Sequence, residues 1–270
     1  MLPIERIRLF LFDMDGTLYL GEQLYPFTAE LLATIRAQQK TYMFMTNNSS
    51  KNVDDYIRKL ARLGIAATEA DFITSAQVTA HYLMAHHPHE HYYVCGTRSL
   101  LSQLADAGLD VTQTADDRIS GIIAGYDTEL TYQKLDDVSR LLSTKELLYF
   151  ATHPDTVCPT EYGFVPDCGA MCEMLYQATG KRPTVIGKPE PLMPQLAMQM
   201  AGTTADETLV MGDRLYTDIE CGLRAGAHTV LVLSGETTYE DYAAAARKPE
   251  AVMADGGELL AMLRALPCAH

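Results

Sequence analysis

An apolar run that ends in two carboxylates constrains the fold of this chain more than any other feature. The run from Leu9 to Phe12 is short and unbroken, which is typical of a strand buried on both faces. Asp13 and Asp15 follow it, and Gly16 can turn the chain. Ligands of open α/β sheets bind outside the carboxyl ends of the strands, so we expect both acids at a crevice. Paired carboxylates there favour a hard cation such as Mg²⁺, and an acidic turn that caps the next helix is the alternative.

Three further predicted strands also end in polar groups. In chain order these groups are Thr46, Asn47 and Asn48 after residues 41–45, Lys188 at the end of residues 184–188, and Asp213 with the nearby Asp218 after residues 208–212. Hydroxyls, amides and free backbone N–H groups can hold a phosphate, although they also make an ordinary helix N-cap. Asp218 alone would equally fit the first turn of a helix. Taken together, acids, a lysine and polar groups at four strand ends indicate phosphoryl transfer.

The composition restricts the class of protein and of partner. The chain has 270 residues, 47% hydrophobic and 21% charged, as in a globular protein with one large or two moderate domains. Its net charge of −14 and pI near 4.9 argue against nucleic acid or an anionic membrane as partner, and they leave a small anionic substrate open.

The cysteines and the apolar runs indicate the compartment. No apolar run approaches about 20 residues, and Asp13 interrupts the N-terminal one, so we expect neither a signal peptide nor a membrane span. The six cysteines are scattered without a C-x-x-C pair, which is typical of free thiols in a reducing cytosol. They are Cys95, Cys158, Cys168, Cys172, Cys221 and Cys268. We therefore expect a cytoplasmic protein.

The middle of the chain reads as a separate unit. Strand patterns at residues 92–95, 121–126 and 147–151 alternate with helical ones. The stretch between the second and third polar strand ends is too long for an ordinary crossover, so an insertion is expected. Residues 153–169 are rich in proline and glycine, which predicts a long irregular loop. After it, residues 184–188 are expected to resume the first sheet.

The four polar stretches together resemble the motifs of the haloacid dehalogenase (HAD) superfamily. Asp-Met-Asp-Gly-Thr-Leu, Thr-Asn-Asn-Ser, Gly-Lys-Pro and Gly-Asp-Arg-Leu-Tyr-Thr-Asp are similar to those of its NagD-like, nitrophenylphosphatase-like branch. The resemblance covers nearly the whole chain. It implies an α/β fold with a Rossmann-like, doubly wound parallel-sheet core at residues 1–79 and 184–270, and an inserted α/β cap domain of the C2 type at residues 80–183.

The resemblance also implies a mechanism and its residues. It implies a Mg²⁺-dependent phosphomonoester hydrolase that acts on small phosphorylated metabolites. Asp13 would attack phosphorus to give an aspartyl-phosphate, and Asp15 would protonate the leaving oxygen and later activate water. Lys188 would neutralise the nucleophile and the phosphate. The implied phosphate ligands are Thr46, Asn47, Asn48 and Lys188, and the implied metal ligands are Asp13, Asp15 through its backbone carbonyl, Asp213 and Asp218.

The cap departs from the pattern of that branch. Thr-Asn-Pro-Asp is replaced by a stretch with His153, and the usual Pro-Gly turn reads Pro-Asp at Asp167. The substrate therefore stays open among sugar phosphates, nucleotides, phosphoglycolate-like acids and pyridoxal phosphate, and we expect residues 153–172 to select the leaving group. The oligomeric state is open, with a homodimer through the cap as one alternative. The alternative function is a phosphate-accepting regulatory or binding module with little turnover, which would not need the inserted domain.

Overall fold

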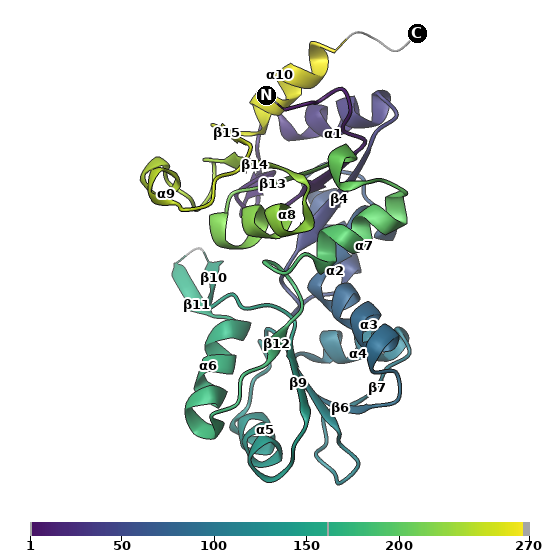
Figure 1. Cartoon of the computed structure of the whole chain (residues 1–270), viewed down its shortest axis with the longest axis vertical. Helices are drawn as coiled ribbons and strands as arrows, with labels where there is room; N and C mark the ends of the chain where they lie inside the picture. Colours follow the sequence, from purple (N-terminus) through teal and green to yellow (C-terminus); the bar gives the residue numbers. More distant parts are fainter. Residues whose placement is uncertain (1, 161, 267–270) are drawn as a thin grey trace. The chain divides into compact units, whose positions relative to one another are not determined.

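The computed structural model describes residues 2–160 and 162–266, which form two compact units (Figure 1). Unit 2 consists of Asn47–Tyr56 and Thr74–Gly187, and unit 1 of the remaining described residues. The units are defined by contacts within the folded chain. The predicted division into domains at 79/80 and 183/184 concerns independent folding and stays a prediction.

Unit 1 contains a six-stranded sheet in the order β15-β14-β13-β1-β4-β5. Its strands are β1 (Leu9–Phe12), β4 (Thr41–Thr46), β5 (Phe72–Thr74), β13 (Thr208–Gly212), β14 (His228–Val232) and β15 (Ala251–Met253). β1 pairs in parallel with both β4 and β13, and all four of its residues are buried. From β1 the chain proceeds outward along one half of the sheet, and from β13 along the other half. The order therefore reverses between β1 and β13, which makes this a doubly wound sheet with its switch point there.

Two pairs of helices pack in unit 1, α1 with α10 and α7 with α8. The helices with residues in this unit are α1 (Thr28–Ala37), α2 (Val53–Arg62, whose first turn belongs to unit 2), α7 (Leu192–Ala201), α8 (Glu220–Ala225), α9 (Tyr239–Ala244) and α10 (Gly256–Arg264). A short hairpin, β2 (Tyr19–Leu20) and β3 (Gln23–Leu24), follows β1. Single helical turns lie at Glu69–Asp71, Ala205–Glu207 and Leu215–Ile219, and the last of them has the wider π-helical form.

Unit 2 has a parallel sheet of its own, in the order β12-β9-β8-β6-β7. Its strands are β6 (His91–Cys95), β7 (Asp110–Thr112), β8 (Gly121–Ala124), β9 (Leu148–Ala151) and β12 (Thr184–Val185), and its helices are α3 (Ser75–His86), α4 (Arg98–Asp106), α5 (Tyr132–Thr144) and α6 (Cys168–Thr179). α5 and α6 pack on one another over a core that contains Tyr93, Ile122 and Val138. β7 was not predicted.

The expectation that residues 184–188 resume the first sheet is wrong. β12 pairs with β9, so it closes the sheet of unit 2 instead. Its two residues are too short for the sequence to indicate a partner, and β9 offers a free edge beside β8. Lys188 therefore does not end a strand of the sheet that carries Asp13.

The predicted irregular loop at residues 153–169 is also wrong in its centre. β10 (Val157–Thr160) and β11 (Gly163–Pro166) form an antiparallel two-stranded hairpin. The prolines suggested a loop, but a two-stranded hairpin has outward edges on both sides, where the missing N–H of a proline costs no ladder hydrogen bond. Tyr162 and Phe164 on this hairpin are 82% and 64% exposed.

Two expectations concern membranes and thiols. Within the part of the chain that the structure describes, no helix combines the length and the apolar character that crossing a membrane requires. The five described cysteines are all free thiols, and Cys268 lies outside the described residues.

Candidate active site

Two of the predicted acids meet at the switch point of the sheet in unit 1. Asp13 follows β1 and Asp213 follows β13, and the two strands pair with Phe12 beside Met211. The Asp13 N–H continues the ladder by donating to the Met211 carbonyl at 2.9 Å. Thr46 ends β4, on the other side of β1. The fold therefore gathers three predicted site residues at one edge of the sheet.

Lys188 joins two of the carboxylates. Its Nζ donates to Asp13 Oδ1 and to Asp218 Oδ1, both at 2.6 Å, and to the Met45 carbonyl at 3.3 Å. The lysine is only 3% exposed. Burial works against its charged form, but the two carboxylates outweigh burial and raise the pKa of Lys188 above its usual value. The ammonium therefore stays charged and fixes both acids.

Asp213 completes a cluster of three acids. One ligand oxygen from each of Asp13, Asp213 and Asp218 lies within 4.8 Å of the others. Asp213 Oδ2 accepts the Glu236 N–H at 2.7 Å, whereas Oδ1 is buried and has no partner among the described residues. A Cβ at Gly235 would collide with this carboxylate. The loop after β14 can thus approach Asp213 closely only because residue 235 is a glycine.

The crowding of these acids appears in their protonation. Burial raises the pKa of Asp13 to about 6. The positive charge of Lys188 lowers this pKa and the negative charge of Asp218 raises it, but burial has the largest effect. Burial and the charges of Asp13 and Asp218 raise the pKa of Asp213 to about 8. One lysine does not compensate the two buried carboxylates of Asp213 and Asp218 together with the partly buried Asp13.

The residues fit a hard divalent cation. Three carboxylates with an unpartnered buried oxygen, Asp213 Oδ1, supply the all-oxygen donor set that such a cation prefers. A cation would also offset the charge that Lys188 leaves uncompensated. Asp13, Asp213 and Asp218 are therefore a candidate cation site.

Asp15 has a different environment from these three acids. Its side chain is 46% exposed, its Oδ1 accepts the Gly21 N–H at 3.4 Å, and its Oδ2 lies 3.9 Å from Lys59 Nζ. Lys59 in turn lies over the Tyr19 ring, 4.1 Å from its centroid. An accessible carboxyl two residues from the partly buried Asp13 can exchange protons with substrate and water.

The three predicted phosphate ligands at the end of β4 and directly after it differ in what they contact. Thr46 is buried, at 8% exposure. The Asn47 amide donates to Asp155 Oδ2 at 3.1 Å. Asn48 Oδ1 accepts from the Ser50 N–H and hydroxyl at 2.9 and 2.7 Å, so this side chain also orders its own loop. Their role as phosphate ligands stays a prediction.

The sequence reasoning missed two residues at the cation site. Arg214 donates its N–H to Asp218 Oδ2 at 3.1 Å, and its guanidinium Nε lies 2.8 Å from Glu236 Oε2. The pKa of Arg214 is raised because nearby acids, Asp13 first, outweigh burial. The second missed residue is Glu236, in the loop after β14. The sequence does predict a strand before Ser234, and β14 pairs in parallel with β13, so its carboxyl end lies at the same edge of the sheet as those of β1 and β13.

Comparisons with known proteins agree with this geometry. Residues 10–110 match the family model described as haloacid dehalogenase-like hydrolase, and residues 185–259 match a second HAD hydrolase-like model. An acid sugar phosphatase from Staphylococcus epidermidis is 32% identical over 238 residues, which are 88% of this chain and 91% of that protein. The chain belongs to the haloacid dehalogenase-like hydrolases.

Solved structures of HAD hydrolases extend the agreement to the fold. The 4-nitrophenylphosphatase from Thermotoga maritima superposes with a TM-score of 0.90 at 36% identity, and the match covers 96% of this chain and 98% of that one. The glycerol phosphate phosphatase from Mycobacterium tuberculosis, solved with magnesium, gives a TM-score of 0.89 at 31% identity over 97% of this chain and 78% of that one. The predicted fold class and the predicted enzyme class, a HAD-type phosphatase, are confirmed.

The HAD comparisons also bear on the metal. The glycerol phosphate phosphatase has been solved with calcium as well as with magnesium. These neighbours support a divalent metal in HAD hydrolases, in agreement with the all-oxygen cluster of Asp13, Asp213 and Asp218.

Proposed function

We propose that this protein is a Mg²⁺-dependent phosphatase that hydrolyses small phosphorylated metabolites through a phosphoryl group carried on Asp13. The observation that carries the proposal is the Lys188 ammonium, which binds Asp13 and Asp218 at 2.6 Å beside the unpartnered Asp213 Oδ1. A carboxylate nucleophile is thereby held next to one fixed positive charge, the Lys188 ammonium, and next to oxygen ligands that can bind a second positive charge, the cation. Phosphoryl transfer needs both, because the attacking group and the substrate are negatively charged.

The proposed reaction has two steps. A carboxylate oxygen of Asp13 forms a bond to phosphorus while the bond to the ester oxygen breaks, and Asp15 gives its proton to that leaving oxygen. In the second step Asp15 takes a proton from water, the water oxygen bonds to phosphorus, and the bond from Asp13 to phosphorus breaks to release phosphate. Asp13 must remain ionised and Asp15 must exchange a proton, so their different environments suit their different roles.

Charge stabilisation comes from Lys188 and from the cation. Lys188 holds Asp13 in its ionised form and faces the charge that arrives with the phosphate. The residues that would hold Mg²⁺ are Asp13, the backbone carbonyl of Asp15, Asp213 and Asp218. When bound, the cation shields the nucleophile from the phosphate and stabilises negative charge on the transferring group.

The proposed phosphate ligands besides Lys188 are Thr46, Asn47 and Asn48. Thr46 is the best supported of the three, because β4 pairs directly with β1 and ends beside Asp13. Asn47 and Asn48 follow it directly in the chain and contribute through their amides.

A small phosphorylated metabolite is proposed as substrate because the relatives share the phosphate and differ in what carries it. They are named as an acid sugar phosphatase, a 4-nitrophenylphosphatase and a glycerol phosphate phosphatase. The core residues recognise only the phosphate, so the leaving group is selected elsewhere. We assign that selection to residues 153–172, whose hairpin exposes two aromatic side chains.

The test is phosphate release from a panel of phosphomonoesters with Mg²⁺, for the native protein and for Asp13→Asn. We expect Asp13→Asn to remove turnover on every ester that the native protein hydrolyses. Asp136→Asn is the matched control, because Asp136 is exposed on α5 and its substitution should leave the rates unchanged. Turnover by Asp13→Asn at more than about one thousandth of the native rate would refute the covalent route.

The same assay separates the alternative function. A phosphate-accepting module with little turnover would release one equivalent of alcohol per protein and then stop. A phosphatase releases alcohol and phosphate together over many turnovers, so the number of turnovers decides between the two.

A further inference from the structure

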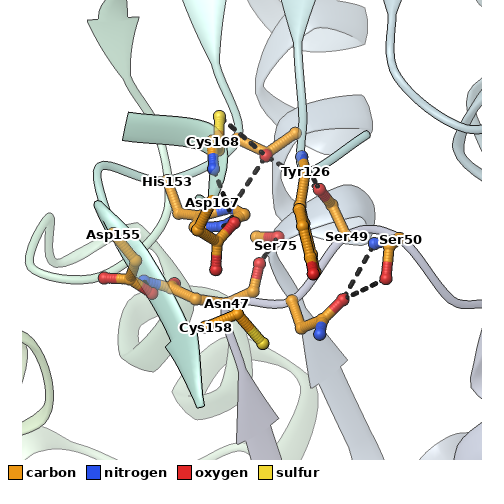
Figure 2. A network of polar contacts seen from close by, with 12 residues as sticks. Asn47, Ser49, Ser50, Ser75, Tyr126, His153, Asp155, Cys158, Asp167 and Cys168 are labelled. Atoms are coloured by element: carbon orange, nitrogen blue, oxygen red, sulfur yellow. Dashed lines mark hydrogen bonds and ion pairs between the residues drawn. The ribbon is translucent and has the colours of Figure 1, made fainter. Parts of the chain in front are cut away.

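A second cluster of possible metal ligands lies within unit 2, with no residue in common with the site above. His153, Asp155 and Asp167 each offer one ligand atom, and these three atoms lie within 4.8 Å of one another. The three residues are 0%, 6% and 4% exposed. Figure 2 shows their side chains gathered on one side of a polar network, beside the ribbon of the hairpin.

The backbone around the hairpin brings these residues together. Asp155 and Asp167 flank β10 and β11, so they stand at the two ends of its base. The Asp167 N–H donates to the Thr156 carbonyl at 3.0 Å, and the Gly169 N–H donates to the Asp155 carbonyl at 2.7 Å. A Cβ at Gly169 would collide with the Pro154 carbonyl, so only glycine allows this approach. The convergence is built into the main chain.

The side-chain contacts leave one oxygen unused. His153 Nε2 lies 2.9 Å from Asp167 Oδ1, which also accepts the Cys168 N–H at 2.6 Å. Asp155 Oδ2 accepts the Asn47 amide at 3.1 Å, whereas Asp155 Oδ1 is buried and has no partner in residues 2–160 and 162–266. A buried carboxylate oxygen without a partner is costly. This oxygen is available to bind a cation.

The charges of the cluster point to a divalent cation. No lysine or arginine among the described residues forms an ion pair with Asp155 or Asp167. Two buried carboxylates and one imidazole thus carry a net negative charge whether or not the imidazole is protonated. A cation of charge +2 with a neutral imidazole would bring the cluster to zero.

The donor set selects the kind of cation. One imidazole nitrogen and two carboxylate oxygens suit a first-row transition metal such as Zn²⁺, whereas Mg²⁺ prefers oxygen ligands alone. Ligand atoms around a tetrahedral Zn²⁺ lie about 3.4 Å apart when each bond is about 2.1 Å. The three ligand atoms lie within 4.8 Å of one another, so closing on the cation needs a movement of at most about 1.4 Å, which side-chain rotation can supply.

A second layer of contacts orients the imidazole. His153 Nδ1 lies 2.9 Å from Thr152 Oγ1, which lies 3.0 Å from Ser49 Oγ, and Ser49 Oγ accepts the Tyr126 N–H at 3.0 Å. Such a partner on the other ring nitrogen is the usual support for a metal-bound histidine. It leaves Nε2 as the nitrogen that faces the two acids.

We propose that His153, Asp155 and Asp167 bind a Zn²⁺-class cation that closes the base of the β10–β11 hairpin. The site is separate from the proposed Mg²⁺ site in its residues and its ligand chemistry. Its function is to hold the ends of the hairpin together, and the hairpin is the segment that carries the exposed Tyr162 and Phe164.

The test measures Zn²⁺ binding by titration calorimetry on the full chain, stripped with chelator. Asp213→Asn is present in every sample to weaken the core cation site. We expect one equivalent of Zn²⁺ in this background, and affinity at least about 100-fold weaker when His153→Asn or Asp155→Asn is added. His91→Asn is the matched control, since His91 is a buried histidine of the same unit that contacts an acid, Asp110, at 2.9 Å. It should leave the affinity unchanged.

X-ray absorption at the zinc edge of the Asp213→Asn chain loaded with one equivalent gives a readout that needs no substitution in the His153 cluster. The proposal predicts the scattering of one imidazole in the zinc environment. Unchanged affinity in His153→Asn, loss of binding in His91→Asn, or a zinc environment made of oxygen alone would each overturn it.

Discussion

Replacing Lys188 with methionine tests the charge balance on which the core site depends. The side chain keeps much of its length but loses the ammonium that contacts Asp13 and Asp218 at 2.6 Å. Removing one partner of a buried ion pair costs about 3–5 kcal/mol of unfolding free energy, because the charge that remains is uncompensated. We also expect the hydrolysis rate to fall by about 10² to 10³.

The loss of stability should depend on pH in a defined direction. Without Lys188, Asp13 would take up a proton and keep it in the folded state, while its unfolded pKa stays near 3.8. The folded variant then binds more protons than the unfolded chain, so its stability falls by about 1.4 kcal/mol per pH unit. In the native protein this fall ends near pH 6, where Asp13 ionises. The difference between the two proteins should therefore grow by about 2.7 kcal/mol from pH 6 to pH 8.

Urea unfolding of the chelator-treated protein at pH 6, 7 and 8 measures this difference. Lys181→Met is the matched control, because Lys181 pairs with Glu146 at 2.8 Å but is 43% exposed. Exposed pairs contribute about 0–1 kcal/mol, so this variant should show a small effect without a pH trend. A Lys188→Met variant as stable as the native protein at pH 8, or a difference that stays constant from pH 6 to 8, would refute the reasoning.

Three other predictions concern the acid, the cation and the hairpin. With 4-nitrophenyl phosphate in stopped flow, Asp15→Asn should release about one equivalent of nitrophenol and then turn over slowly, because the variant lacks the carboxylate that activates water. Steady turnover at the native rate would contradict the role of Asp15. Mg²⁺ affinity, measured by calorimetry, should tighten about 10-fold per pH unit between pH 6 and 8. The reason is that Asp213 has a pKa of about 8 and must lose its proton to bind the cation. A flat profile would argue against this carboxyl as a ligand. Tyr162→Ser should change the ratio of kcat/KM among phosphate esters without changing Tm. The control, Tyr132→Ser, removes an 83% exposed tyrosine on α5 and should change neither quantity. Identical substrate profiles for the two variants would show that the hairpin does not select the substrate.

The sequence predicted the part of the site that depends on strand ends. The runs before Asp13, Thr46 and Asp213 are apolar and end abruptly, and the structure pairs all three as parallel neighbours. Lys188 was assigned to the same cluster as Asp13, and its Nζ does contact Asp13. The predicted strand that ends at Lys188 in the first sheet is wrong, because β12 pairs with β9 in the sheet of unit 2.

What the sequence could not predict depends on contacts between distant residues. Glu236 reaches Asp213 through its backbone N–H, and a backbone group leaves no mark in the residue type. His153 and Asp167 were noted only as departures from a motif. Their contact at 2.9 Å depends on the hairpin between them, whose prolines suggested an irregular loop. Pairings of short strands are set by the surrounding structure more than by local propensity.

The arrangement of Lys188 has a consequence for how the enzyme matures. In proteins whose buried ligands have no other counter-charge, folding waits for the metal. Here an internal ammonium already pairs with two of the three acids, so the polypeptide can reach its native state first and bind a cation afterwards. Such an enzyme can lose its cation and regain it without unfolding, and its activity can then follow the supply of free ion in its surroundings.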